Sequence, residues 1–255
     1  MVLSENIAAC VNVHADPLFV RTNLNCLQTN LTNNINLIIE ESAYDSWPFD
    51  KFTDVKIIKG FRHNFKRNPY RNVFYGLIET YKNFPDKEWY CYSESDNFFL
   101  NDTIKLDLSL INEKYQLVTT DFRIIFCDGY LFERFFKKIL RTHYCMLGCC
   151  YFIKKDFMKY LSEQLLPKFL NFATLIPDCY FYPDFYQYDI AEVLIPTACR
   201  ELEHGVFNLS AFKMTKFVGM SDLYKMRFRP PIVKNELNEN TCIVHAIKNR
   251  KFLFE

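Results

Sequence analysis

Glycine is scarce in this sequence, with 6 residues in a chain of 255. Collagen-like, low-complexity and linker-rich architectures need far more glycine, so the composition excludes them. The chain also contains neither the G-x-x-x-x-G-K-S/T loop nor the G-x-G-x-x-G turn, two glycine-rich motifs that cradle phosphate groups. Phosphate binding through such a loop is therefore excluded.

The chain also lacks long hydrophobic runs and an excess of charge of one sign. No apolar stretch approaches the roughly 18 residues that a membrane-spanning helix needs, and the run from Ile7 to Val13 is too short for a signal peptide. We therefore expect no integral membrane segment and a cytoplasmic protein.

The net charge is +1 with 24% charged residues, a balance that leaves no electrostatic footprint for nucleic acid. We expect no nucleic-acid partner.

Cysteine, by contrast, is plentiful. Ten cysteines occur at irregular spacing, and most lie in apolar, strand-like runs where a thiol packs as a small hydrophobic group. The cluster of Cys145, Cys149 and Cys150 lacks the paired C-x2-C spacing of a zinc site. We therefore predict buried, reduced thiols rather than disulfides or a zinc site.

Strand and helix patterns alternate along the first 100 residues. Apolar runs predict strands over residues 7–13, 35–39, 55–60 and 90–96, and a helix over residues 71–84. An earlier helix follows Asp16, a predicted N-cap, and Pro17, which suits a first helical turn. Its predicted apolar face comprises Leu18, Val20, Leu24, Leu27 and Leu31. This alternation predicts an α/β fold, with a mostly parallel central sheet flanked by helices.

The second half of the chain is less regular. We predict strands over residues 115–119, 145–153 and 241–245, and helices over residues 129–140 and 155–166. A further helix begins near Asp189, after a loop rich in aromatic residues. No repeat, low-complexity segment or linker divides the chain, so we expect one domain over residues 1–255.

Two acids separated by one residue end the predicted strand at residues 90–96. Side chains at positions i and i+2 of a strand project to the same side, so Glu94 and Asp96 can point together beyond the strand's carboxyl end. Ligands bind in that region of open α/β sheets. Paired carboxylates suit Mg²⁺ or Mn²⁺, although acid-x-acid spacing by itself is common.

The order of these elements along the chain resembles that of the GT-A fold glycosyltransferases, which are enzymes with a Rossmann-like half and an acceptor-binding half. The resemblance covers roughly residues 7–250. It implies a nucleotide-sugar-binding half over about residues 1–100 and a less regular acceptor-binding half over about residues 101–255. Glu94-Ser95-Asp96 occupies the place of the family's Asp-x-Asp metal motif, which implies that Ser95 lies against the donor.

The resemblance also implies which residues contact the nucleotide. Val13, His14 and Ala15 end the opening strand, which in this family packs on the nucleotide base. Glu40 and Glu41 end the second strand, where an acid reads the uracil or the ribose.

Further residues are implied to flank the donor or to bind its pyrophosphate and the metal ion. Arg71 opens a helix that matches, in position, one flanking the donor. His245 and Lys248 resemble a C-terminal His and a nearby Lys that bind the metal and the pyrophosphate in some members. The implied cofactor is Mn²⁺ or Mg²⁺, with Glu94, Asp96 and His245 as its ligands.

Two positions depart from the family's pattern. The metal motif begins with Glu94 rather than Asp, a longer side chain that can still ligate through one oxygen. Adjacent glutamates, Glu40 and Glu41, stand where Asp is more usual, and which of them faces the base stays open.

Transfer with inversion of configuration needs a base near the acceptor hydroxyl. Asp189 and Glu192 are the candidates, because acids three residues apart at a helix start lie on one face. Glu192 also resembles the acid that certain inverting members place beneath the acceptor. The helix dipole alone favours acids in a first turn, and a retaining enzyme would need neither as a base. We favour inversion.

The expected function is therefore a metal-dependent glycosyltransferase. It would move a sugar from a nucleoside diphosphate donor, with UDP-sugar as the first choice, to a hydroxyl of a glycan or glycoconjugate. A non-catalytic glycan- or nucleotide-binding protein of the same fold is one alternative, kept open by Glu94 in place of Asp. A sugar nucleotidyltransferase is another, which the lack of a basic glycine-rich loop near residue 14 disfavours.

Overall fold

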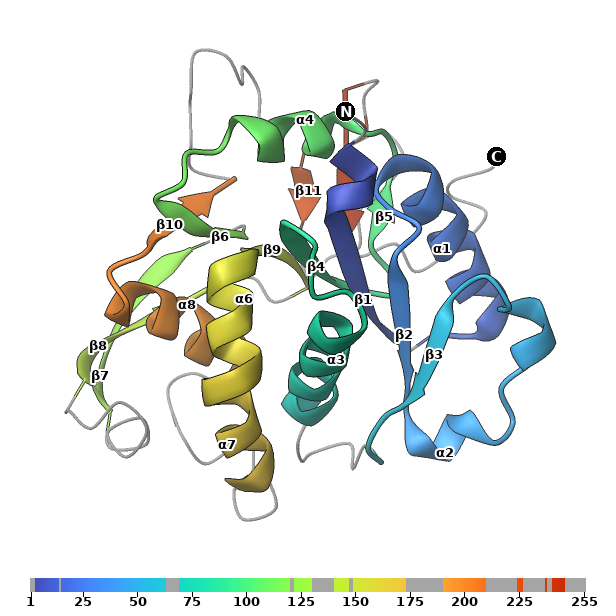
Figure 1. The fold of residues 1–255 in the computed structure, drawn as a ribbon, viewed down its shortest axis with the longest axis horizontal. Coiled ribbons are helices and arrows are strands. Elements are labelled where there is room, and N and C mark those ends of the chain that lie inside the picture. The colour runs from blue at the N-terminus through green and yellow to red at the C-terminus, as the bar shows by residue number, and fades with distance from the viewer. Residues whose placement is uncertain are drawn as a thin grey trace.

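The structure is a computed structural model that describes residues 3–13, 15–62, 69–119, 122–129, 140–146, 149–172, 190–209, 224–226, 237 and 240–245. Its largest sheet has seven strands in the order β10-β6-β9-β4-β1-β2-β3 (Figure 1). In chain order these strands are β1 (Ile7–Val13), β2 (Ile35–Ile39), β3 (Lys56–Lys59), β4 (Trp89–Glu94), β6 (Tyr115–Thr119), β9 (Cys150–Lys154) and β10 (Gly205–Asn208).

This sheet is mostly parallel, as the sequence predicts. β4, β1, β2 and β3 pair in parallel, and so do β6 and β10. β9 alone among the seven runs antiparallel to its two neighbours, β4 and β6. Every residue of β2 and the first five of β4 are buried, because both faces of the sheet are covered.

Helices cover both faces of this sheet. One face carries α3 (Pro69–Asn83), α6 (Lys155–Tyr160), α7 (Leu166–Phe172) and α8 (Ile190–Glu201), which share a core with Tyr90 and Tyr92 of β4 (Figure 1). The other face carries α1 (Pro17–Asn30) and α4 (Thr103–Leu110), which pack on the alternate side chains of the same strands. The shorter helical segments are η1 (Leu3–Asn6), α2 (Glu41–Tyr44), η2 (Phe49–Lys51) and η3 (Leu161–Leu165), a π-helical turn.

The start of α1 follows the predicted capping chemistry. Asp16 Oδ1 accepts hydrogen bonds from the backbone N–H groups of Leu18 at 3.1 Å and Phe19 at 3.0 Å, and Pro17 is the first helical residue. The predicted apolar face is wrong at Leu18, which is 57% exposed. The other four predicted residues of that face are buried: Val20, Leu24, Leu27 and Leu31.

Two smaller sheets lie beside the seven-stranded sheet, and β12 (Ile243–His245) in one of them falls within the strand predicted over residues 241–245. β5 (Phe98–Phe99), β12 and β11 (Tyr224–Met226) form a three-stranded sheet, and β7 (Arg123–Gly129) pairs with β8 (Leu140–Cys145). The predicted helix over residues 129–140 is wrong at both ends, which belong to β7 and β8; residues 130–139 lie outside the described part of the chain. The predicted strand over residues 145–153 is divided between β8 and β9.

The helix predicted over residues 155–166 is longer than expected. α6, η3 and α7 continue without a break from Lys155 to Phe172. Seven cysteines in the described part of the chain are free thiols, and all but Cys26 are buried, in agreement with the predicted reduced state. Within the described ranges, no helix combines the length and the hydrophobicity needed to cross a membrane.

Candidate metal centre

The carboxyl ends of β1 and β4 meet where the strand order changes direction. From β1 the chain proceeds through α1 to β2 and then β3 on one side, whereas β4 returns to the other side of β1. In open α/β sheets such a switch point leaves a crevice outside the carboxyl ends of the strands. Glu94, the last residue of β4, is paired with Asn12 of β1 at this position.

A tight turn leads from Glu94 into β5 and holds Asp96. The N–H of Asn97 donates to the carbonyl of Glu94 at 3.1 Å and closes the turn. The turn is tied to β1, because the N–H of Ser95 donates to the carbonyl of Asn12 at 3.1 Å. It is also tied to the start of β9, because the N–H of Glu94 donates to the carbonyl of Cys149 at 2.9 Å.

The pairing of β5 with β12 brings His245 to this turn from far along the chain. Ile243 lies opposite Phe99 and Val244 opposite Phe98 in an antiparallel register. The next residue of β12, His245, therefore reaches the level of the turn that precedes β5.

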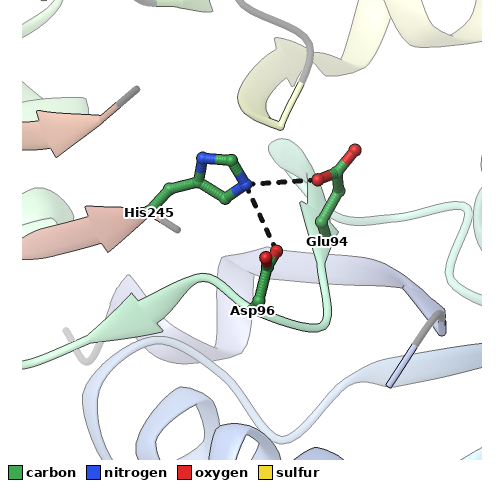
Figure 2. A group of neighbouring side chains, drawn as sticks. All are labelled: Glu94, Asp96 and His245. Atoms are coloured by element: carbon green, nitrogen blue, oxygen red, sulfur yellow. Dashed lines mark hydrogen bonds and ion pairs between the residues drawn. The ribbon is translucent and has the colours of Figure 1, made fainter. Parts of the chain in front are cut away.

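Figure 2 shows the resulting group of three side chains, with one imidazole nitrogen facing both carboxylates. His245 Nε2 lies 3.3 Å from Glu94 Oε2 and 3.2 Å from Asp96 Oδ1. The three potential ligand atoms all lie within 4.8 Å of one another. Adjacent ligands of an octahedral ion with bonds of about 2.1 Å are roughly 3.0 Å apart, so these spacings fit Mg²⁺ or Mn²⁺ after small side-chain adjustments.

The group is buried on one side and open on the other. Asp96 is 2% exposed and His245 is 1% exposed, whereas the side chain of Glu94 is 26% exposed. Two carboxylates held together out of water repel each other unless a positive charge lies between them. A divalent cation with open coordination positions toward solvent would supply that charge and still bind a substrate oxygen.

The protonation of His245 is coupled to these neighbours. Burial opposes a charged imidazole, but the hydrogen bonds from its ring to the carboxylates of Asp96 and Glu94 outweigh burial and raise the pKa of His245 above its ordinary value. The proton then takes the place of a cation between the carboxylates. Because a metal ligand must be a neutral imidazole, cation binding at this group releases the proton.

Cys149 lies beside His245 as a neutral thiol. Burial raises the pKa of the Cys149 thiol to about 12, against the lowering effect of His245. A thiol of this kind contributes no negative charge at neutral pH. The charge of the centre therefore comes from Glu94 and Asp96.

Of the residues predicted to contact the base, Val13 and Ala15 lie at or just beyond the carboxyl end of β1, as the metal centre does. Val13 ends β1, and both Val13 and Ala15 are partly buried. Ser95 is fully buried in the turn between β4 and β5. His14 and Lys248, also predicted to contact the donor, lie outside the described residues.

Glu40 and Glu41 follow β2 at this edge but differ in their surroundings. The carbonyl of Glu40 accepts hydrogen bonds from Ala43 and Tyr44, both at 3.0 Å, and begins α2, an element that the sequence analysis missed. Glu41 is exposed and lies 3.7 Å from Lys59 Nζ in a surface ion pair. These contacts do not decide which of the two glutamates would face a bound nucleotide.

Arg71 lies in the first turns of α3, near the carboxyl end of β3. Its guanidinium carbon is 4.0 Å from the centroid of the Phe61 ring. Asn72 holds Phe61 in place, accepting from its N–H at 2.6 Å and donating to its carbonyl at 3.1 Å. Arg71 is thus positioned by stacking, and its Nε has no hydrogen-bond acceptor among the described residues.

Of the two predicted bases, the structure describes Glu192 only; Asp189 lies outside the described residues. Glu192 is in the first turn of α8 and is 5% exposed. Its carbonyl accepts a hydrogen bond from the N–H of Met146 at 3.1 Å. Met146 precedes Cys149 by three residues, a span of at most about 11 Å. Glu192 belongs to α8, which is part of the helix layer that covers the Tyr92 face of β4.

Sequence reasoning missed two residues that surround the centre. Cys149 was assigned only to a buried strand, and its carbonyl in fact holds the turn. Asn97 follows directly after Asp96 and is fully buried. Its position beside the acid pair was the one signal in the sequence that could have identified it.

This chain is distantly similar to known proteins. No protein-family model matches the chain. The "Ribosomal operon-associated A protein" of Euglena gracilis is 24% identical over 211 residues, which are 81% of this chain and 35% of that protein. The chain thus spans about a third of the length of this relative.

Several solved structures are similar in outline. A 4-diphosphocytidyl-2C-methyl-D-erythritol synthase from Anaerococcus prevotii has a TM-score of 0.46 and 14% identity, over 84% of this chain and 93% of that one. A cytidylyltransferase from Leptospira borgpetersenii has a TM-score of 0.38 and 11% identity, over 65% and 71% of the two chains. A glycosyltransferase involved in glycosylation of the major capsid of PBCV-1 has a TM-score of 0.35 and 12% identity, over 71% and 74%. By name, the first is a synthase and the other two are transferases; at these TM-scores the similarity carries no conclusion about the reaction of this chain.

Proposed function

We propose that this chain is a divalent-cation-dependent glycosyltransferase whose donor is a nucleoside diphosphate sugar. The observation that carries the proposal is the convergence of Glu94, Asp96 and His245 at the switch point of the sheet, with spacings of 3.2 and 3.3 Å. Oxygen ligands favour Mn²⁺ or Mg²⁺, ions that bind phosphates through their open positions.

The three side chains would hold the cation against the diphosphate of the donor. When bound there, the cation supplies Lewis-acid stabilisation of the negative charge on the leaving nucleoside diphosphate. Glu94 and Asp96 provide the compensating negative charge. His245 is held by β12, so its position depends on the pairing of β12 with β5.

The rest of the donor would extend along the carboxyl ends of β1, β2 and β3. In this proposal Val13, His14 and Ala15 contact the base, and Glu40 or Glu41 binds the base or the ribose. UDP is the first choice of nucleotide. Residues 1–100 then form the donor half of a single domain.

Arg71, with its guanidinium stacked on Phe61, would bind a phosphate oxygen, as would Lys248. Both would act alongside the cation, because a diphosphate carries more negative charge than one divalent ion neutralises. Ser95 would lie against the donor at the turn.

The acceptor would approach from the half formed by residues 101–255. Glu192 is the proposed base, with Asp189 as the second candidate, because Glu192 lies on the helix layer toward which the side chain of Glu94 projects. Alternation along β4 places Glu94 on the same face as Tyr90 and Tyr92, which pack with α8. A glycan hydroxyl between Glu192 and the donor sugar would lose its proton to the carboxylate as the new bond forms.

The test is turnover with a panel of nucleotide sugars, Mn²⁺ or Mg²⁺ and glycan acceptors. Release of nucleoside diphosphate together with a glycosylated product supports the proposal. Asp96→Asn should lower turnover by at least about 100-fold, because the cation's contribution to transition-state stabilisation is several kcal/mol. Asp107→Asn is the matched control: Asp107 is 4% exposed, and α4 packs on η1 at the amino end of β1, away from the centre.

The same assay, run in parallel with a nucleoside triphosphate and a sugar phosphate as substrates, separates the two alternatives. A non-catalytic binding protein would bind the nucleotide with Mn²⁺ and release no nucleoside diphosphate. A sugar nucleotidyltransferase would release pyrophosphate from a nucleoside triphosphate and a sugar phosphate. Either result would overturn the proposed glycosyl transfer while leaving the cation site intact.

A further inference from the structure

Asn97 is a buried residue that directly follows Asp96 in the turn that carries the metal ligands. Its side chain is fully buried. Its amide nitrogen donates to Ser93 Oγ at 3.2 Å and also to the carbonyl of Cys149. Its own carbonyl accepts a hydrogen bond from the side-chain amide of Asn23 on α1. Asn97 therefore links the turn to β4, to the start of β9 and to α1.

The chemistry of these partners determines which way the amide of Asn97 points. The carbonyl of Cys149 can only accept, and it already accepts from the N–H of Glu94. An amide rotated by half a turn would place Asn97 Oδ1 against this carbonyl oxygen, where two acceptors repel. The amide nitrogen therefore faces Cys149, and Oδ1 faces elsewhere.

Asn97 Oδ1 is then left as a buried acceptor. Among the described residues, no donor forms a hydrogen bond with it. A buried acceptor without a partner is costly, and native proteins commonly satisfy one with an ordered water. The side chain also lies close to His245: continuing the register of Ile243 with Phe99 and Val244 with Phe98 places His245 opposite Asn97. Opposite residues of an antiparallel pair have Cβ atoms about 4.5–5.5 Å apart on the same face.

We propose that Asn97 is a positioning residue of the cation site, whose Oδ1 accepts a hydrogen bond from a water molecule bound to the cation. This inference rests on the proposed function, since it requires the cation at Glu94, Asp96 and His245. The amide of Asn97 sets the shape of the turn through Ser93 and Cys149. Its oxygen orients the water, as hydrogen-bonding partners outside the ligand set commonly do in metal sites.

The test measures Mn²⁺ affinity by electron paramagnetic resonance, together with the melting temperature of each protein without added metal. The variants are Asn97→Ala and the matched control Asn36→Ala. Asn36 is also fully buried and hydrogen-bonded, to Thr80 at 3.1 Å between β2 and α3, away from the turn. Both substitutions should lower the melting temperature. Only Asn97→Ala should weaken Mn²⁺ binding, by about 10- to 100-fold.

Ser93→Ala is a milder second variant, useful if Asn97→Ala does not fold. It removes one acceptor of the Asn97 amide with little change in volume, and it should weaken Mn²⁺ binding by several-fold. Failure of the wild-type protein to bind Mn²⁺ would overturn the cation site itself. If the wild type binds Mn²⁺ and the folded Asn97→Ala or Ser93→Ala variant binds it with the same affinity, the role of Asn97 is overturned and the cation site stands.

Discussion

Gly76 marks the closest approach of α3 to the sheet, and replacing it by alanine tests how tightly this layer is packed. A Cβ added at Gly76 would lie 2.5 Å from Cys10 Sγ on β1 and 2.8 Å from Ile38 Cγ1 on β2. Ordinary contacts between such atoms are about 3.5–4.0 Å. Both neighbours are fully buried in the core, so neither can move into solvent.

Two effects of Gly76→Ala oppose each other. Alanine is favoured over glycine in a helix interior by about 1 kcal/mol. Forcing an extra methyl group into a packed core costs about 1–3 kcal/mol. The overlap here is roughly 1 Å on two sides, so we expect the packing cost to exceed the helix gain, with a net loss of about 1 kcal/mol in the free energy of unfolding.

Urea denaturation followed by circular dichroism measures this loss, and a double variant identifies its cause. Cys10→Ala removes the sulfur atom nearest to the new methyl group. The Cys10→Ala/Gly76→Ala protein should therefore be more stable than the sum of the two single changes predicts, by about 0.5 kcal/mol or more. A Gly76→Ala protein as stable as the wild type would refute this account of the α3 contact.

Three further predictions concern regions away from the site. Glu203 lies in the turn that follows α8 and has a φ of 60°, which a glycine adopts more readily, so Glu203→Gly should raise the free energy of unfolding by about 0.5–1 kcal/mol in a denaturation experiment; a loss would contradict this. Arg21 Nη1 and Nη2 donate hydrogen bonds to Asp54 Oδ1 at 2.6 Å and Oδ2 at 2.7 Å, and these bonds hold the pKa of Asp54 below its usual value. The stability that this pair contributes is present above about pH 4 and is lost as the pH falls through the lowered pKa of Asp54. Because both residues are partly exposed, acid titrations of wild type and Asp54→Asn should differ by less than about 1 kcal/mol, and a larger gap would refute the surface assignment. Mass spectrometry of alkylation at about pH 8 should show partly buried Cys26 modified before Cys10, whose pKa burial raises to about 12; the reverse order would show that Cys10 is accessible.

Regular elements with strong local signals were predictable from the sequence. Asp16 and Pro17 identified the start of α1, and the apolar run from Ile35 to Ile39 is β2. Leu18 shows the limit of the hydrophobic pattern: it belongs to an apolar stripe, but it lies in the first turn of α1 and is exposed. The predicted helix at residues 129–140 failed at its ends because a run of apolar residues fits a strand as well as a helix.

The candidate site was predictable in part. The acid pair at the end of the predicted strand was found from its spacing, but the predicted reason was wrong for Asp96: β4 ends at Glu94, and a turn rather than strand alternation holds Asp96. His245 entered only through the family resemblance, because its position depends on the pairing of β5 with β12, a contact between residues more than 140 positions apart. Cys149 carries no local signal either, since it acts through its backbone carbonyl, which every residue has.

Anomalous X-ray scattering from crystals grown with Mn²⁺ and a nucleoside diphosphate would locate the cation directly. We predict a manganese peak with Glu94, Asp96 and His245 as ligands at about 2.1–2.3 Å, and diphosphate oxygens in its remaining positions. A peak at other residues, or its absence with the nucleotide bound, would contradict the proposed metal centre.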